Sequence, residues 1–327
     1  MIKTRLTQFF GISHPIILAP MTPAAGADLA QAVAEAGGLG LLGGGYGERA
    51  WLEAESAKVT RSDVGCGFIT WSMAQQPDLL DFAIERHPRV IMLSFADPAP
   101  FAPRIKKAGV PLICQVHTVE QALQAADVGA DIVVAQGTEV GGHGQIARST
   151  LPFVPTVVDA LSKHAPNVFV VAAGGIADGR GLAAALMLGA EGALLGSRFW
   201  ATQESLIHPN AKAKVVAATG DETIRTSVYD IVRKKAWPDG YTGRLMKNEF
   251  IEKWHGREAE LRSLQESELV KVEAAAEQGD YDVANVTVGE SIRLIGDLPR
   301  AADVVRRVTH EAWVQLNKYA APMETAA

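Results

Sequence analysis

The stretch FVVAAGGIADGRGLAAALMLGAEGALLGS (residues 169–197) contains one full copy of the pattern that decides the fold. An apolar run ends at two glycines, an alanine-rich helical segment follows and stops at a glycine, and a second apolar run begins. Near-continuous apolar runs of this length are typical of strands covered on both faces, as in a parallel sheet. Parallel neighbours need a crossover connection, and the helical segment provides one. The stretch therefore predicts a strand–helix–strand unit.

The same pattern recurs from the N-terminus onward. Helical stretches with apolar residues at three- and four-residue spacing occur at 29–37, 119–130 and 179–190. Eight strand–helix units in about 200 residues predict an α/β protein with a (β/α)8 TIM barrel, whose active site lies at the C-terminal ends of the strands. A doubly wound open sheet is the alternative that this pattern leaves open. The eight apolar runs are IILAPM (16–21), GLGLLGG (38–44), CGFITW (66–71), VIMLSF (90–95), PLICQV (111–116), IVVAQG (132–137), FVVAAGG (169–175) and GALLGS (192–197).

The composition changes after Phe199. Charged residues become dense, and the segment 246–280 has the character of exposed helix. We therefore expect a smaller, mainly helical second domain at 206–299, inserted in a barrel formed by 1–205 and 300–327. The stretch 298–319 is a more amphipathic helix, which either packs on the barrel or joins two copies in a homodimer.

Charge and cysteine content exclude several classes of protein. The 327 residues include 31 basic and 37 acidic side chains, a net charge of −6, without a run of Lys or Arg that would favour a nucleic acid partner. No apolar stretch approaches the ~18–20 residues that span a bilayer. The cysteines, Cys66 and Cys114, lie in apolar segments and are expected to be reduced core residues. These features predict a soluble cytoplasmic protein.

Small residues mark the ends of the last two predicted strands. Gly174 and Gly175 follow the seventh strand, and Gly196 and Ser197 follow the eighth. Glycine lets a phosphate approach backbone N–H groups, and the loops after strands seven and eight are the usual phosphate site of this barrel. The ordinary alternative is two glycine-rich turns with Asp178 as a helix N-cap. Because both loops have the feature, the sequence favours a phosphate site.

A histidine follows the sixth strand in QGTEVGGHGQ (136–145). His143 lies among glycines, including Gly142, which let a ligand approach the backbone closely. Histidine can accept or hold a proton near neutral pH. An isolated loop histidine is often merely solvated, but His143 lies on the same face as the predicted phosphate site. His117, after the fifth strand, is a second candidate. No HExxH motif or carboxylate cluster indicates a catalytic metal.

Two kinds of ligand fit a phosphate site beside such a histidine: a phosphorylated metabolite in a non-redox enzyme, or FMN. The strand ends carry few charges, and no lysine is available for a Schiff base there. This lining favours the flavin. It comprises Ala19, Pro20, Met21, Phe68 to Trp71, Gln115 and Gln136.

Four segments together resemble the nitronate monooxygenase family, also called 2-nitropropane dioxygenases. They are HPIILAPM (14–21), GTEVGGHGQ (137–145), AAGGIADGRG (172–181) and GSRFWATQESLIHP (196–209). The resemblance implies an FMN-containing barrel with a helical domain that closes over the flavin. It also implies oxidation of alkyl nitronates by O₂ to a carbonyl compound and nitrite, without a metal.

The resemblance assigns roles to individual residues. His143 matches the family's catalytic histidine, and the four small residues after strands seven and eight match its phosphate-binding backbone. The turn 19–21 matches the segment beside the flavin, and Gln115 and Gln136 match polar positions near its ring. Ile69 stands where some relatives have asparagine. Similar FMN barrels include NADH:quinone reductases and enoyl-acyl-carrier-protein reductases, so an NAD(P)H-dependent flavin reductase is the alternative.

Overall fold

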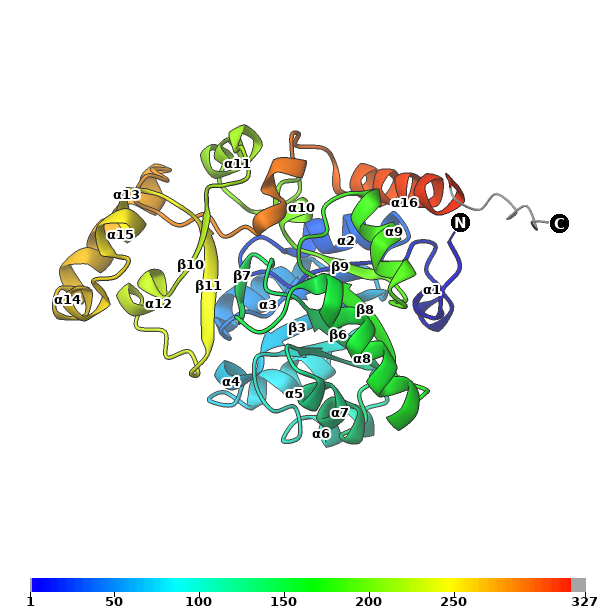
Figure 1. Cartoon of the computed structure of the whole chain (residues 1–327). Helices are drawn as coiled ribbons and strands as arrows, with labels where there is room; N and C mark the ends of the chain where they lie inside the picture. Colours follow the sequence, from blue (N-terminus) through cyan, green and yellow to red (C-terminus); the bar gives the residue numbers. More distant parts are fainter. Residues whose placement is uncertain (1, 319–327) are drawn as a thin grey trace.

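A computed structural model describes residues 2–318 and contains an eight-stranded parallel barrel (Figure 1). The strands follow one another in the order β1-β9-β8-β6-β5-β4-β3-β2. The backbone of Leu39, just before β2, closes the barrel against β1: the Leu18 N–H donates to the Leu39 carbonyl at 2.9 Å, and the Leu39 N–H donates to the Ile16 carbonyl at 2.9 Å. Each predicted apolar run contains one strand or most of one, which confirms the TIM barrel. The strands are β1 (Ile16–Leu18), β2 (Gly40–Gly43), β3 (Val64–Ile69), β4 (Ile91–Ser94), β5 (Leu112–Val116), β6 (Ile132–Gln136), β8 (Phe169–Ala173) and β9 (Ala193–Leu195).

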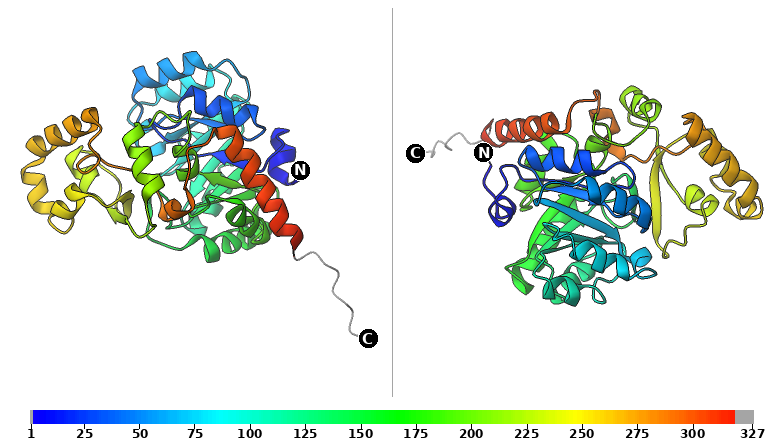
Figure 2. Two further views of the ribbon diagram at one scale, coloured as in Figure 1. Left: turned by 90° about the horizontal axis from the view of Figure 1, so that it is seen from above. Right: turned by 180° about the vertical axis from the view of Figure 1, so that it is seen from behind.

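Helices surround this barrel (Figure 2). The three helical stretches expected at 29–37, 119–130 and 179–190 correspond to α2, α7 and α9, each of which ends two or three residues earlier than the pattern suggested. The barrel helices are α1 (Arg5–Phe10), α2 (Ala27–Glu35), α3 (Arg49–Lys58), α4 (Thr70–Met73), α5 (Asp78–Ile84), α6 (Ala102–Lys107), α7 (Val119–Asp127), α8 (Thr150–His164), α9 (Gly179–Met187), α10 (Ser197–Trp200) and α16 (Ala301–Lys318).

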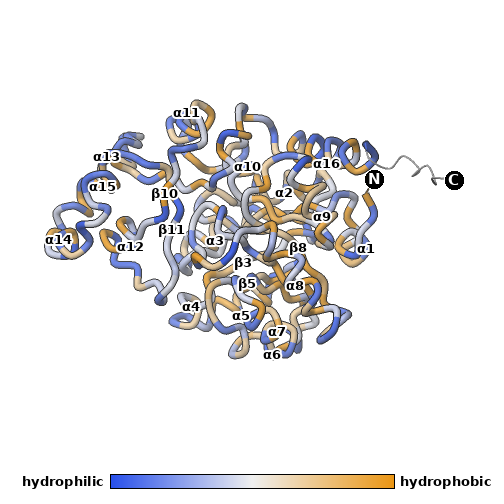
Figure 3. The backbone as a smooth tube through the Cα atoms, in the orientation of Figure 1, coloured by the Kyte–Doolittle hydropathy of each residue, from blue (hydrophilic) through white to orange (hydrophobic). Residues whose placement is uncertain are grey.

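The strands are buried on both faces, which explains their continuous apolar runs. In β6, Ile132 and Val134 belong to the cluster inside the barrel, whereas Val133 and Ala135 pack beneath the helices. Leu6 of α1 joins the interior cluster. Hydrophobic colouring accordingly concentrates around the barrel strands and the helices that cover them (Figure 3). Cys66 and Cys114 are buried and free, as predicted, and burial raises the pKa of the Cys66 thiol to about 12.

A second group of elements lies to one side of the barrel, at the left of Figure 1. It is mainly helical, as expected, but the sequence reading missed two strands within it. Strand β11 pairs antiparallel with β10 and also with β7 (Gly142–Gln145), the segment that contains His143. The elements are α11 (Pro209–Ala217), β10 (Thr223–Thr226), α12 (Val228–Val232), β11 (Tyr241–Met246), α13 (Glu249–Trp254), α14 (Glu258–Ser263), α15 (Gln265–Gln278) and the 3-10 helix η1 (Glu290–Leu294).

Helices α12 to α15 and strand β11 share an apolar core that contains the fully buried Trp254, whose Nε1 donates to Glu268 at 3.0 Å. Helix α11 and η1 instead share a cluster with barrel residues such as Trp200. The last helix, α16, contacts α9 and α2, so the described part of the predicted amphipathic stretch packs on the barrel. The division into 1–205 with 300–327 and 206–299 remains a prediction, and its residues 319–327 lie outside the described part of the chain. Within residues 2–318, no helix has both the length and the apolar character needed to cross a membrane.

Candidate active site

A cavity of about 540 Å³ lies where the barrel strands end and the second group of elements covers them. Except for the second histidine candidate, His117, and for Thr70 and Trp71, every residue that the sequence predicted for the site lines this cavity. These residues are Ala19, Pro20, Met21, Gln115, Gln136, Gly142, His143, Gly174, Gly175, Gly196 and Ser197. Phe68 and Ile69 also line the cavity.

The glycine loop after β8 is held in shape by Thr150. The Thr150 hydroxyl oxygen lies 3.0 Å from the Gly174 carbonyl oxygen and 2.9 Å from a Glu139 carboxylate oxygen. Gly174 and Gly175 have φ values of 110° and 72°, a backbone conformation that favours glycine. A Cβ on Gly174 would stand 2.8 Å from the Thr150 hydroxyl oxygen. This tight turn leaves a cavity wall without side chains, as a phosphate site requires.

The neighbouring polar groups are engaged within the protein. Asp178 caps α9 by accepting hydrogen bonds from the N–H groups of Arg180 and Gly181, at 2.9 and 3.2 Å. Arg180 pairs with Asp178, and Arg198 pairs with Asp297 at 2.8 Å. Neither arginine lines the cavity, so neither is placed to bind a phosphate there.

His143 lies on a strand and not in a free loop. Its strand β7 pairs with β11, with His143 opposite Gly243. The imidazole Nε2 is 2.9 and 3.0 Å from the two carboxylate oxygens of Asp230. The ring stacks on Trp237 with a centroid distance of 3.6 Å and an interplanar angle of 7°. Two contacts from the second group of elements therefore fix the orientation of the imidazole.

Trp237 belongs to an aromatic wall. Its Nε1 donates to the Tyr46 hydroxyl at 2.9 Å, and its ring meets Trp71 and Phe95 edge-on at 5.4 and 5.1 Å. Burial raises the pKa of Tyr46, so the phenol stays neutral near pH 7. Trp237, Tyr46 and Phe95 line the cavity, and Trp71 packs behind them.

His117, the second histidine candidate, is not among the residues that line the cavity. It lies behind Gln136, with its Nε2 2.6 Å from the Gln136 Oε1. Burial lowers the pKa of His117 to about 4, so the ring is neutral at pH 7. A neutral ring that donates from Nε2 fixes Gln136 Oε1 as the acceptor and leaves the amide NH₂ of Gln136 free to donate. His117 is therefore a positioning residue.

The lining fits a flavin by its own chemistry. The Nε2 of Gln115 is buried without a hydrogen-bond partner in residues 2–318, and Gln115 lines the cavity. An unpaired buried donor of this kind matches the acceptor atoms of a flavin ring. The glycine turn matches the flavin's phosphate. Within the same residues, no group of three His, Cys, Asp or Glu side chains is placed to hold a metal.

Sequence reasoning missed the residues of the second group that complete the site. Asp230 and Trp237 both follow the barrel segment in the chain, and the His143–Asp230 contact spans 87 residues. No local sequence motif indicates that either residue belongs to the site. Only Gly243 and Leu245 are buried in β11, so its sequence contains no apolar run that could have revealed the strand opposite His143.

The fold and the site together define a barrel enzyme with a phosphate-type glycine loop and a carboxylate-bound histidine at the ends of its strands. A family model described as nitronate monooxygenase matches residues 3–83 and 69–311. The chain belongs to the nitronate monooxygenase family, and it is a flavin-dependent oxidoreductase. The resemblance found in the sequence is thus confirmed.

Individual relatives agree with this assignment and extend it. The chain is 32% identical to a nitronate monooxygenase of Neurospora crassa, over 96% of this chain and 94% of the relative. It is 37% identical to a (3aS,4S,5R,7aS)-5-hydroxy-7a-methyl-1-oxo-octahydro-1H-indene-4-carboxyl-CoA dehydrogenase of Rhodococcus jostii, over 76% of this chain and 67% of the relative. The structure of FabK from Thermotoga maritima has a TM-score of 0.84 and 31% identity, over 97% of this chain and 98% of FabK.

Proposed function

We propose that this enzyme binds FMN and oxidises alkyl nitronates with O₂ to a carbonyl compound and nitrite. Membership of the nitronate monooxygenase family supports this reaction. The observation that carries the proposal is the His143–Asp230 pair in the cavity wall, at 2.9 Å, because a carboxylate-bound imidazole can take the α-proton of a nitroalkane.

The predicted residues divide into two sets around the proposed cofactor. Gly174, Gly175, Gly196 and Ser197 would hold the FMN phosphate, and Gln115 and Gln136 would donate to the ring. The turn Ala19–Met21 and Gly142 would lie beside the flavin. Bound FMN supplies the electron acceptor for the substrate and the route of those electrons to O₂.

His143 handles the proton. Asp230 accepts the hydrogen bond from Nε2–H, which leaves the lone pair on Nδ1 as the base. The carboxylate then stabilises the imidazolium that forms when Nδ1 takes the α-proton. With a preformed nitronate no proton has to be removed, and the protonated ring instead stabilises the bound anion. Trp237 keeps the ring plane fixed in both cases.

The variant His143→Asn tests this assignment with two substrates. It is expected to lose turnover of neutral nitroalkanes far more than turnover of preformed nitronates, because only the neutral substrate needs a base. Steady-state rates are measured for both substrates on enzyme of equal flavin content. Equal losses on the two substrates would refute the role of base.

An NAD(P)H-dependent flavin reductase is the second candidate, favoured by the likeness to FabK over nearly the whole chain and by the relative named as a dehydrogenase. Mixing the oxidised enzyme anaerobically with propyl nitronate or with NADH separates the two. Flavin bleaching by nitronate and not by NADH supports nitronate oxidation, whereas rapid bleaching by NADH alone supports the reductase. The non-redox alternative does not agree with a flavin-dependent family.

Three further properties stay predictions: O₂ as the second substrate, a cytoplasmic location and a homodimer. Sedimentation of the purified enzyme tests the homodimer directly.

A further inference from the structure

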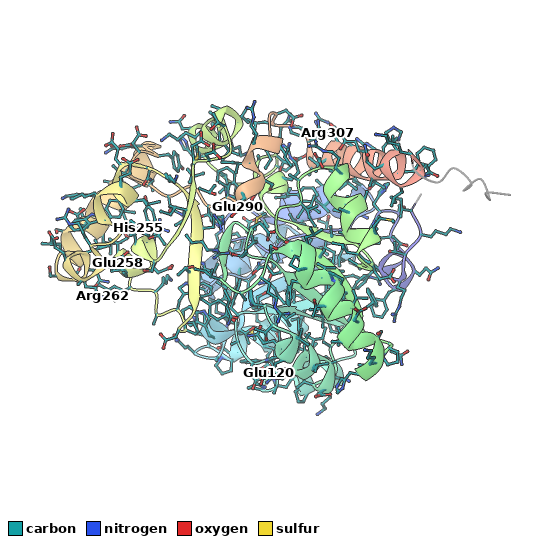
Figure 4. All side chains as sticks on the ribbon, in the orientation of Figure 1. Glu120, His255, Glu258, Arg262, Glu290 and Arg307 are labelled. Atoms are coloured by element: carbon teal, nitrogen blue, oxygen red, sulfur yellow. The ribbon has the colours of Figure 1, made fainter. Side chains whose placement is uncertain are left out.

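Arg233 differs from the other cations near the cavity because, within residues 2–318, no carboxylate lies within ion-pair distance of its guanidinium. It stands at the C-terminal end of α12 and lines the cavity. Its single side-chain hydrogen bond in residues 2–318 runs from Nη2 to the Asn285 Oδ1 at 2.5 Å. By contrast, Lys235 pairs with Glu48 at 3.7 Å, and Arg244 pairs with Glu290 at 2.7 Å. Glu290 is labelled in Figure 4.

The carboxylate nearest to Arg233 in the sequence, that of Asp230, is hydrogen-bonded to another residue. Asp230 precedes Arg233 by one helical turn and bonds to His143 with both oxygens. Burial lowers the pKa of Arg233, and the more distant carboxylates of Asp230 and Glu273 act in the opposite direction. A guanidinium nevertheless keeps its charge and offers five N–H donors in a flat fork. A half-buried cation of this kind, open to a cavity, is a site for an anion supplied by a ligand.

We infer that Arg233, oriented by Asn285, is the subsite that binds the two oxygens of the nitronate group. This inference rests on the proposed function. Residues three apart on a helix are neighbours, roughly 5–6 Å between Cβ atoms, so Arg233 and the Asp230–His143 pair face the same part of the cavity. A nitronate is planar and carries its charge on two oxygens, and this shape matches the guanidinium fork.

In this assignment Arg233 also stabilises the negative charge that forms on the substrate when the α-proton is removed. When His143 Nδ1 takes the α-proton, the C–H bond breaks, its electron pair forms the C=N bond, and the negative charge moves onto the two oxygens. Arg233 binds those oxygens as the charge develops, so it stabilises the product of proton removal more than the neutral nitroalkane. No further oxidant or reductant enters this step.

The test compares Arg233→Gln with Lys235→Gln, which removes one positive charge from the same cavity wall but from an existing ion pair. Charge-assisted hydrogen bonds are worth about 1.5–3 kcal/mol, which predicts a rise of about 10- to 100-fold in the KM for propyl nitronate in Arg233→Gln. We expect a change of less than about threefold in Lys235→Gln, since Glu48 already pairs with the Lys235 charge. Arg233→Lys restores part of the affinity.

Inorganic nitrate, another planar anion with terminal oxygens, provides a readout that does not depend on turnover. Its dissociation constant is measured by titrating the flavin absorbance of the oxidised holoenzyme. Weaker nitrate binding in Arg233→Gln, but not in Lys235→Gln, supports the subsite. Equal effects in both variants, or none in either, overturn it. If the wild-type enzyme binds nitrate through Arg233 yet does not oxidise nitronates, the proposed function fails and the oxyanion subsite stands.

Discussion

The buried His117 makes a quantitative prediction about pH and stability. Its pKa is lowered to about 4 in the folded protein, against an ordinary value of 6.5, and its side chain is 2% exposed. As the pH falls below 6.5, the unfolded chain takes up a proton at this position while the folded protein does not. The free energy of unfolding therefore falls from pH 6.5 down to about pH 4, below which the loss levels off.

The size of the effect follows from the two pKa values. At pH 5 the His117 side chain is mostly protonated in the unfolded state and mostly neutral in the folded state. The free energy of unfolding falls by about 1.4 kcal/mol for each pH unit below 6.5, so it is about 2 kcal/mol lower at pH 5 than at pH 7.5. The full loss, reached below pH 4, is about 3 kcal/mol. Burial of the ring is the main physical cause of the lowered pKa. In addition, Nδ1 has no partner in residues 2–318 that could accept a hydrogen bond from an added proton.

His117→Asn removes the titrating group and keeps an amide that can donate to Gln136. Urea unfolding of the wild type and the variant at pH 7.5 and pH 5 gives four free energies of unfolding. We expect the wild type to lose about 2 kcal/mol more than the variant between the two pH values, because all other titrating groups cancel in the comparison. Equal losses would show that His117 is not held neutral, and the inferred orientation of Gln136 would then lose its basis.

Three substitutions test the remaining contacts of the site. Asp230→Asn should lower kcat/KM for a neutral nitroalkane by about 10- to 100-fold, because the imidazolium of His143 loses a charged partner, while rates with preformed nitronate change little; steady-state kinetics with both substrates measure this. Trp237→Leu removes the ring stacked 3.6 Å from the imidazole and should lower the same constant about 2- to 10-fold without loss of flavin absorbance. Gly174→Ala forces a side chain into a backbone with φ of 110° and within 2.8 Å of the Thr150 hydroxyl, so flavin release, followed by fluorescence, should increase. A flavin content equal to wild type would contradict the assigned phosphate loop.

The barrel and its half of the site could be predicted from the sequence because their signals are local. Each strand is buried on both faces and so appears as one apolar run, and the small residues at 174–175 and 196–197 come directly after such runs. Strands β10 and β11 gave no comparable signal. They are short, only part-buried, and set among dense charges, which favoured a purely helical interpretation. Asp230, Arg233 and Trp237 owe their positions to this hairpin.

The position of His143 follows from both parts of the chain, although the residue itself belongs to the barrel segment. Its strand β7 has β11 as its partner, so the ladder that fixes its backbone comes from the second group of elements. Arg225 holds β7 and β11 together. Its guanidinium donates to the carbonyls of Thr138 at 2.9 Å, Gly144 at 3.2 Å and Thr242 at 2.8 Å. Displacing the second group would therefore not merely uncover a flavin at the barrel mouth. It would remove the neighbouring strand, the carboxylate and the stacked indole together, and leave His143 without the contacts that orient it for its proposed role as the base.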